Sequence, residues 1–201
     1  PPEFRIPELE PYDGELAFVD TQVKRLLDWF EAARLTERTL IVVVGDHGEA
    51  FNEHGERGHS NFVYDVNLHV PMFFTHPTVV PPGKRVPAIV EALDVFPTVL
   101  DLFGFKPPDG LLCRSLASGL VAGKLQDASA YAESHFVFNS FGWAEQRALT
   151  TSRWKYVSST KPQLFERSSD PREKENLLAA QPKVAAKMLS ELRARYESMT
   201  P

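Results

Sequence analysis

The stretch GDHGEAFNEHGERGH, residues 45–59, holds the densest group of chemically active side chains in the sequence, with three histidines, four acidic residues and four glycines in fifteen positions. Asp46 and His47 directly follow the apolar run LIVVV (40–44), and His59 comes twelve residues after His47, far enough for a loop to return it to the same pocket. A carboxylate beside an imidazole suits a divalent ion such as Zn²⁺ or Mn²⁺, and Mg²⁺ or Ca²⁺ is compatible where the other ligands are oxygens. The alternative is a plain turn, in which Asp46 caps the next backbone N–H groups.

Other polar residues near this stretch are interpreted differently. The histidines at 54 and 59 stand five residues apart among glycines, so they do not form the HExxH pair of zincins, whose histidines share one helix face at a spacing of four. Exposed loop charges need no function, and histidines inside strand-like segments are more often hydrogen-bonded structural groups. We therefore interpret the following residues as loop or structural groups: Glu53, His54, Glu56, His69 and His76. His135, at the end of AYAESH, is a further residue that could face the same pocket.

Composition and charge limit the possible partners. The chain has 201 residues, 43% of them hydrophobic, and a net charge of −5, which suits one globular domain or a large piece of one. An acidic chain without a cluster of Lys and Arg is not expected to bind nucleic acid or an anionic membrane surface, so we expect a small-molecule partner. The single Cys113 excludes an internal disulfide and is interpreted as structural. No segment approaches the roughly 18 apolar residues that span a bilayer.

Hydrophobic patterning in the first part of the chain predicts an α/β fold. Residues 15–35 have apolar side chains at helical spacing, and LIVVV (40–44) is typical of a strand covered on both faces. A helix followed by a buried strand favours a mostly parallel sheet flanked by helices. Ligands bind at the carboxyl ends of such strands, which is where Asp46 and His47 stand.

The rest of the chain changes character towards its end. We predict a buried strand at 70–74, a helix at 92–103, a loop-rich connection at 105–128, strands near 128–133, 147–151, 154–158 and 163–166, a helix start at 170–173 and a helix from 182 to about 199. The four later strands are short and aromatic or β-branched, which favours an antiparallel group. The helix start at 170 is predicted because Asp is followed by Pro and, three residues on, by Glu.

Taken in order, the motifs resemble the sulfatase family of the alkaline phosphatase superfamily. PYDGELAFVD, VVVGDHGEAFNEHG, LHVPMFF and LDVFPTVLDLFG resemble a helix, the metal loop, a core strand and a core helix of the catalytic domain. WKYV, QLFE and DPREKENL resemble its C-terminal subdomain. The resemblance implies part of an alkaline-phosphatase-like fold, with residues 1–127 as the C-terminal part of the α/β catalytic domain. Residues 128–201 then form a small subdomain of antiparallel sheet and helix.

The resemblance also implies roles for individual residues. Asp46 and His47 match the second pair of metal ligands of the family, which points to a bound divalent ion. His59 stands where many arylsulfatases carry a lysine that contacts the sulfate, and where related phosphoethanolamine transferases carry a histidine. The implied activity is metal-dependent hydrolysis of a small sulfate ester, with His59 as a catalytic residue. Because His59 departs from the arylsulfatase pattern, a phosphodiesterase or a phosphoethanolamine-type transferase is the alternative.

The family's nucleophile is not found in this sequence. Sulfatases attack with a residue made from Cys or Ser in a C/S-x-P-x-R motif, which the segment Cys113-Arg114-Ser115-Leu116 does not match. Asp46, His47 and His59 provide two or three ligands, whereas Zn²⁺ usually takes four and Ca²⁺ six to eight. We therefore expect a truncated catalytic unit, inactive alone, whose missing N-terminal half supplies the nucleophile and further ligands. An alternative of another class is a non-catalytic metal-binding or interaction module.

Overall fold

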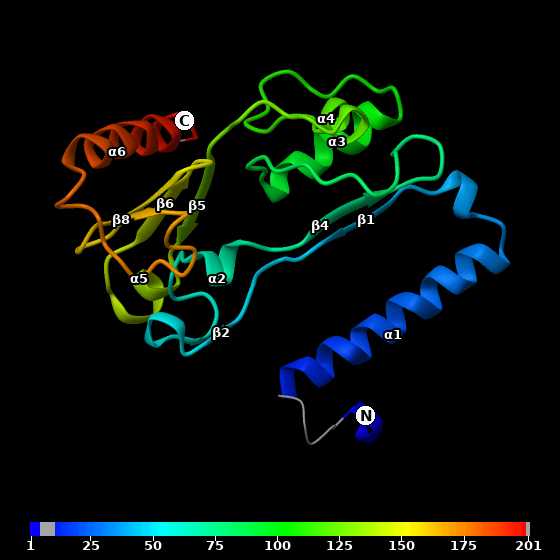
Figure 1. Ribbon diagram of the computed structural model, residues 1–201, viewed down its shortest axis with the longest axis horizontal. Coiled ribbons are helices and arrows are strands. Elements are labelled where there is room, and N and C mark those ends of the chain that lie inside the picture. The colour runs from blue at the N-terminus through cyan, green and yellow to red at the C-terminus, as the bar shows by residue number, and fades with distance from the viewer. Residues whose placement is uncertain (5–10, 200–201) are drawn as a thin grey trace. The chain divides into compact units, whose positions relative to one another are not determined.

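The computed structural model describes residues 1–4 and 11–199 (Figure 1). The chain divides into two compact units, Pro1–Ile41 with Phe74–Pro82, and Val42–Phe73 with Gly83–Pro201. In the described residues no helix is long and apolar enough to cross a membrane.

The first unit is dominated by one long helix. A 3₁₀ turn, η1 (Pro2–Phe4), precedes α1 (Pro11–Ala32), and a second one, η2 (Thr36–Arg38), follows it. The rings of Phe4 and Phe18 meet edge to face with centroids 5.4 Å apart. The amphipathic helix predicted at 15–35 is thus confirmed, although it begins and ends a few residues earlier. His76, in the same unit, is 8% exposed and its Nδ1 accepts the backbone N–H of Thr78 at 3.3 Å, as expected of a structural histidine.

Two predicted strands, β1 (Ile41–Val44) and β4 (Met72–Thr75), form a two-stranded sheet (Figure 1). Their positions confirm the strand predictions, but the prediction that they are covered on both faces is wrong for the described residues. Val43 and Val44 are 43% and 39% exposed, and Phe73 is 62% exposed. A sheet of two strands has no outer layers to shield its faces, which explains this exposure.

A short hairpin and a one-turn helix follow β1. The hairpin pairs β2 (Ala50–Phe51) with β3 (Arg57–Gly58) in antiparallel register, and its connection contains η3 (Glu53–Gly55). The helix α2 (Asp65–Leu68) then leads towards β4. These elements lie within the stretch of clustered charges and the residues just after it.

The predicted helix at 92–103 is confirmed as a 3₁₀ turn, η4 (Ala92–Asp94), that continues into α3 (Val95–Leu102). Glu91 and Asp94 form a reciprocal capping box at its start, and Gly104, with a φ of +77°, stands just past its end. The connection predicted as loop-rich contains one short helix, α4 (Ala117–Ala122). Its six residues are too few to produce a clear helical pattern.

The C-terminal part contains the best-formed core of the second unit. Four strands, β5 (Ala130–Ser134), β6 (Gln146–Thr150), β7 (Trp154–Ser158) and β8 (Gln163–Glu166), are antiparallel in the order β5-β6-β7-β8, as predicted. A helix, α5 (Phe136–Phe141), connects β5 to β6. The helix α6 (Pro182–Glu197) confirms the prediction at 182–199 and covers one sheet face (Figure 1). That core contains Leu149, Tyr156, Leu164, Ala185, Met188 and Leu192.

The helix start predicted at 170–173 is wrong, because Asp170 begins a turn instead. The Asp170 carboxylate accepts the backbone N–H of Glu175 at 2.7 Å. Glu173 has a φ of +53°, which a right-handed helix does not allow, and its side chain is buried. Glu173 pairs with Lys155 of β7 at 2.8 Å, so a long-range contact overrides the local helix signal.

Candidate active site

The end of β1 is held in place by backbone contacts with the segment before β4. The Gly45 N–H donates to the Pro71 carbonyl at 3.0 Å, and the Gly48 N–H donates to the Asn67 carbonyl at 2.8 Å. A Cβ at Gly48 would collide with the carbonyl oxygen of Val66, so only glycine allows α2 to approach this closely. These contacts fix the backbone on both sides of the residues at 46 and 47.

Asp46 and His47 offer two donor groups side by side. The His47 N–H donates to Asp46 Oδ1 at 3.0 Å, and His47 Nε2 lies 3.7 Å from Asp46 Oδ2. The Asp46 side chain is 90% exposed. Its pKa lies below the ordinary value, chiefly because the His47 N–H donates to the carboxylate. Asp46 is therefore ionised at neutral pH, the state that a metal ligand requires.

The hairpin returns His59 to His47, as expected from the loop length. Their imidazole rings stack with centroids 3.8 Å apart and an interplanar angle of 26°. His59 Nδ1 also lies 3.1 Å from Glu49 Oε2. The three sequence-predicted residues thus lie in one small cluster at the end of β1.

Glu49 belongs to this cluster but was missed by sequence reasoning. The register Ala50↔Gly58 of the β2–β3 hairpin brings the residues that flank the pair, Glu49 and His59, together. Strands of two residues are too short to show an alternating pattern, so the hairpin could not be predicted from the sequence. The side chain of Glu49 is 24% exposed, and its donor oxygen lies within 4.8 Å of donor nitrogens of His47 and His59.

The remaining candidates lie elsewhere. The ring of His54 stacks on Tyr64 with centroids 3.6 Å apart, which agrees with a structural role. His135 pairs with Glu145 at 3.1 Å and Glu133 at 3.4 Å, and it is not among the described residues that line the cavity beside Asp46. The structure therefore does not bring His135 to the cluster.

Two residues interpreted from the sequence as loop or structural groups need correction. Glu56 is not an exposed loop charge, because it is 3% exposed and accepts the Asn67 side-chain amide at 2.6 Å. His69 is exposed rather than structural. It lines a cavity of about 650 Å³ together with Asp46, His47 and Arg167. The cluster at the end of β1 thus opens into a cavity that also reaches the C-terminal sheet.

A buried charge network ties α2 to the C-terminal sheet. Lys155 of β7 has a fully buried side chain, and its Nζ lies 2.7 Å from Asp65 Oδ1 and 2.8 Å from Glu173 Oε1. Burial alone would raise the pKa of Asp65, but Lys155 and Arg167 outweigh it and hold that pKa below its ordinary value. Burial raises the pKa of Glu173, which shares Lys155 with Asp65. This network fixes the first residue of α2, and α2 in turn contacts Gly48 in the loop after β1.

The donor groups present fit a divalent ion. An ionised carboxylate, a second carboxylate and two imidazoles are the mixed oxygen and nitrogen set that Zn²⁺ or Mn²⁺ accepts. The donor atoms of His47, Glu49 and His59 lie close enough to share an ion. Asp46 is not part of that group of three, but its Oδ2 lies 3.7 Å from His47 Nε2, and Glu49 is already hydrogen-bonded to His59, so we favour Asp46 and His47 as the ligands.

Comparison with known proteins decides the family. The family model described as Sulfatase matches residues 3–105, about half of the chain, including β1, the loop after it and β4. The chain belongs to the sulfatase family. Its relatives include Arylsulfatase K of Mus musculus, 29% identical over 91% of this chain and 34% of that protein. Arylsulfatase K of Xenopus laevis is 30% identical over 91% of this chain and 36% of that protein. The chain thus spans about a third of the length of these relatives.

Several solved enzyme structures share the fold of this chain. BT4656 in complex with D-glucosamine-2-N,6-O-disulfate superposes with a TM-score of 0.82 at 23% identity, over 94% of this chain and 40% of that chain. The phosphonate monoester hydrolase of Silicibacter pomeroyi superposes with a TM-score of 0.78 at 26% sequence identity, over 96% of this chain and 44% of that chain. BT1596, a 2-O GAG sulfatase, superposes with a TM-score of 0.72 at 26% sequence identity, over 89% of this chain and 40% of that chain.

Proposed function

We propose that the full protein containing this chain hydrolyses sulfate esters with the help of a divalent metal ion. Asp46 and His47 are the metal ligands that this chain contributes, and His59 is a catalytic residue. One observation carries the proposal: in a member of the sulfatase family, Asp46 and His47 line a cavity at the end of β1, and His59 stacks on His47. For a member of the sulfatase family, metal-assisted hydrolysis of a sulfate ester is the first function expected of such a cluster.

The site residues of this chain have different roles in the proposed reaction. The lowered pKa of Asp46 keeps a negative charge ready for the ion. His47 Nδ1 lies 2.9 Å from the Gly48 carbonyl, an acceptor that requires the proton on Nδ1 and leaves Nε2 as the donor atom for the metal. Glu49 accepts a hydrogen bond from His59 Nδ1 and so orients the ring. When the ring carries a second proton, its Nε2–H would donate to an ester oxygen or transfer that proton to the leaving group. A bound divalent ion would neutralise the negative charge on the ester oxygens.

Further parts of the catalytic unit come from the N-terminal half of the same protein. We infer that this half supplies the nucleophile and additional ligands, and that residues 1–201 alone are inactive. In the complete catalytic domain, β1 and β4 belong to a mostly parallel sheet flanked by helices. Residues 1–127 complete that domain, and residues 128–201 form its C-terminal subdomain.

The relatives suggest the substrate class. A solved structure at 26% identity is named as a 2-O GAG sulfatase, which favours a sulfated sugar as the substrate. The test is to compare the full-length protein on an aryl sulfate, a sulfated disaccharide, a phosphate monoester and a phosphonate monoester, with divalent metal present. We expect kcat/KM to be highest for a sulfate ester. Turnover of phosphonate or phosphate esters with no sulfate ester hydrolysis would overturn the proposal.

A second candidate is hydrolysis or transfer of phosphorus esters, as by a phosphodiesterase or a phosphoethanolamine-type transferase. Two points favour it: by the family resemblance His59 stands where many arylsulfatases carry a lysine, and a phosphonate monoester hydrolase is 26% identical with a TM-score of 0.78. The same substrate comparison separates the two. Identifying the residue in the upstream nucleophile motif supports the result, since Cys or Ser indicates a sulfatase and Thr a transferase.

A further inference from the structure

A second hollow lies between the segment after α5 and the turn that joins β7 to β8. Its volume is about 500 Å³. Its lining includes three aromatic side chains, two amides and one lysine: Phe62, Tyr64, Trp143, Gln146, Gln163 and Lys161. None of these residues belongs to the cluster around Asp46. Aromatic faces beside amides and a cation are suited to a ligand with apolar C–H faces, hydroxyl groups and negative charge.

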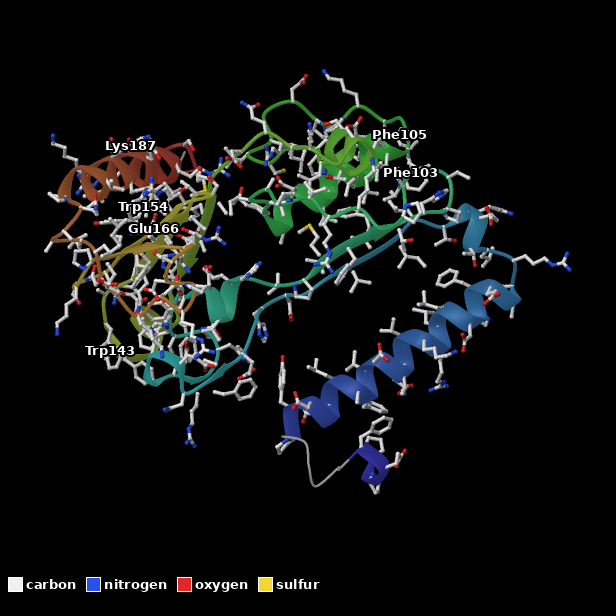
Figure 2. The ribbon with its side chains drawn as sticks, in the orientation of Figure 1. Phe103, Phe105, Trp143, Trp154, Glu166 and Lys187 are labelled. Atoms are coloured by element: carbon white, nitrogen blue, oxygen red, sulfur yellow. The ribbon has the colours of Figure 1, made fainter. Side chains whose placement is uncertain are left out.

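Trp143 provides an open aromatic face. It is 59% exposed and stands at the outer edge of the second unit in the view of Figure 2. Its ring packs against Phe141 with centroids 5.4 Å apart, so one ring supports the other. The face of an indole carries partial negative charge and attracts the weakly positive C–H groups of a sugar ring.

Polar groups around the hollow complement a sulfated sugar. The Tyr64 hydroxyl donates to Gln163 Oε1 at 2.8 Å, which leaves the Gln163 amide NH₂ to donate to a ligand hydroxyl. Lys161 is exposed and forms no ion pair with an acidic side chain in the part of the chain that the structure describes. Its ammonium group is therefore available to a sulfate or carboxylate.

The hollow adjoins the segment that carries His59. Phe62, which lines it, stands three residues after His59 in the sequence. The Ser134 hydroxyl, at the end of β5 and just before α5, donates to the Ser60 carbonyl at 2.5 Å. The segment that leads into α5 is thus bonded to the residue next to His59, and the segment after His59 reaches the hollow at Phe62.

We propose that this hollow is a carbohydrate subsite, which binds a sulfated sugar ring adjacent to the ring that carries the scissile ester. Trp143 stacks on the ring, Gln146 and Gln163 bond its hydroxyl groups, and Lys161 pairs with its sulfate. The proposal rests on the sulfatase function proposed above and narrows its substrate class to oligosaccharides.

The test uses the full-length protein with two probes, nitrophenyl sulfate and a heparin-derived tetrasaccharide, measured as a substrate or as an inhibitor of nitrophenyl sulfate turnover. Trp143→Ala should raise the KM or Ki of the tetrasaccharide by about tenfold. That change should far exceed its effect on kcat/KM for nitrophenyl sulfate. Trp143→Phe should retain most of the affinity, and Lys161→Gln should weaken tetrasaccharide binding and its dependence on salt.

Trp29→Ala is the matched control, because Trp29 is 56% exposed on α1 and does not line the hollow. We expect this variant to show no selective loss of affinity for the tetrasaccharide relative to nitrophenyl sulfate. The subsite is overturned if the wild-type enzyme does not bind the tetrasaccharide. It is also overturned if Trp143→Ala lowers the melting temperature and weakens both probes equally, which would show that another part of the protein covers Trp143. An enzyme that turns over no sulfate ester contradicts the proposed function instead.

Discussion

Glu49 and His59 form the least expected pair of the site. Their 3.1 Å contact joins a residue just before β2 to one just after β3, and His59 in turn stacks on His47. A histidine whose Nδ1 is bound to a carboxylate keeps its ring orientation and presents its Nε2 outwards. We therefore assign Glu49 a positioning role through His59, rather than a place among the metal ligands.

Glu49→Ala in the full-length protein is expected to lower kcat/KM for a sulfate ester by about 10- to 100-fold, because His59 loses the partner that orients it. Bound metal, measured by elemental analysis, should stay at the wild-type level. Glu49→Gln keeps an acceptor oxygen of the same size and should retain most of the activity. A loss of the metal in Glu49→Ala would show instead that Glu49 is a ligand.

At the scale of elements, the short helix α2 connects the loop after β1 to the C-terminal sheet. Its first residue, Asp65, is held by Lys155 of β7, and its backbone at Asn67 accepts the Gly48 N–H. The Asp65 N–H also donates to Glu173 Oε2 at 2.7 Å. The position of Gly48 and the loop after β1 therefore depends on Lys155 and Glu173, which stand more than 100 positions after Gly48 in the sequence.

Lys155→Met should lower the free energy of unfolding by about 3–5 kcal/mol at neutral pH, because it leaves Asp65 and Glu173 without their buried cation. Chemical denaturation of the full-length protein measures this. The pKa of Asp65 is lowered in the fold, so its ion pair stabilises the protein above the unfolded value of 3.8 and is lost as pH falls through the lower folded value. The deficit of Lys155→Met should therefore persist from pH 7 to about 4 and shrink as the pH is lowered further, because Asp65 becomes neutral only below its unfolded value of 3.8.

Lys187→Met is the control, because the Lys187 side chain is 74% exposed and its ion pair, among the residues that the structure describes, is with Glu191 on the same helix. Such surface pairs contribute about 0–1 kcal/mol. Equal effects of the two substitutions, or a Lys155→Met deficit that grows towards acid pH, would contradict the role given to the buried network.

The sequence predicted these elements unevenly, for physical reasons. Strands β5 to β8 and helices α1 and α6 were predicted because their apolar residues repeat at the spacing of their secondary structure. Asp46, His47 and His59 were predicted because residue type and position after a strand are visible in the sequence. Glu49, Lys155 and Glu173 were missed as functional or network residues, since their partners are distant and long-range contacts leave no local pattern.

At the scale of the whole molecule, the apolar surface of the chain is large. Val43, Val44 and Phe73 are exposed on β1 and β4, and Leu16, Val19 and Leu26 are about half exposed on α1. Surfaces of this kind mark contacts with further protein. They agree with the proposal that this chain, about a third as long as its relatives, forms one part of a larger catalytic unit.

The central claim is that Asp46 and His47 complete a metal site of this larger enzyme. Its most direct test is the metal content of the full-length protein, measured by elemental analysis beside sulfate ester turnover, for the wild type and for Asp46→Ala. We expect the wild type to bind a divalent ion and Asp46→Ala to lose both the ion and the activity, because the ion loses its charged ligand. An Asp46→Ala variant that retains full metal content and full activity would contradict the account.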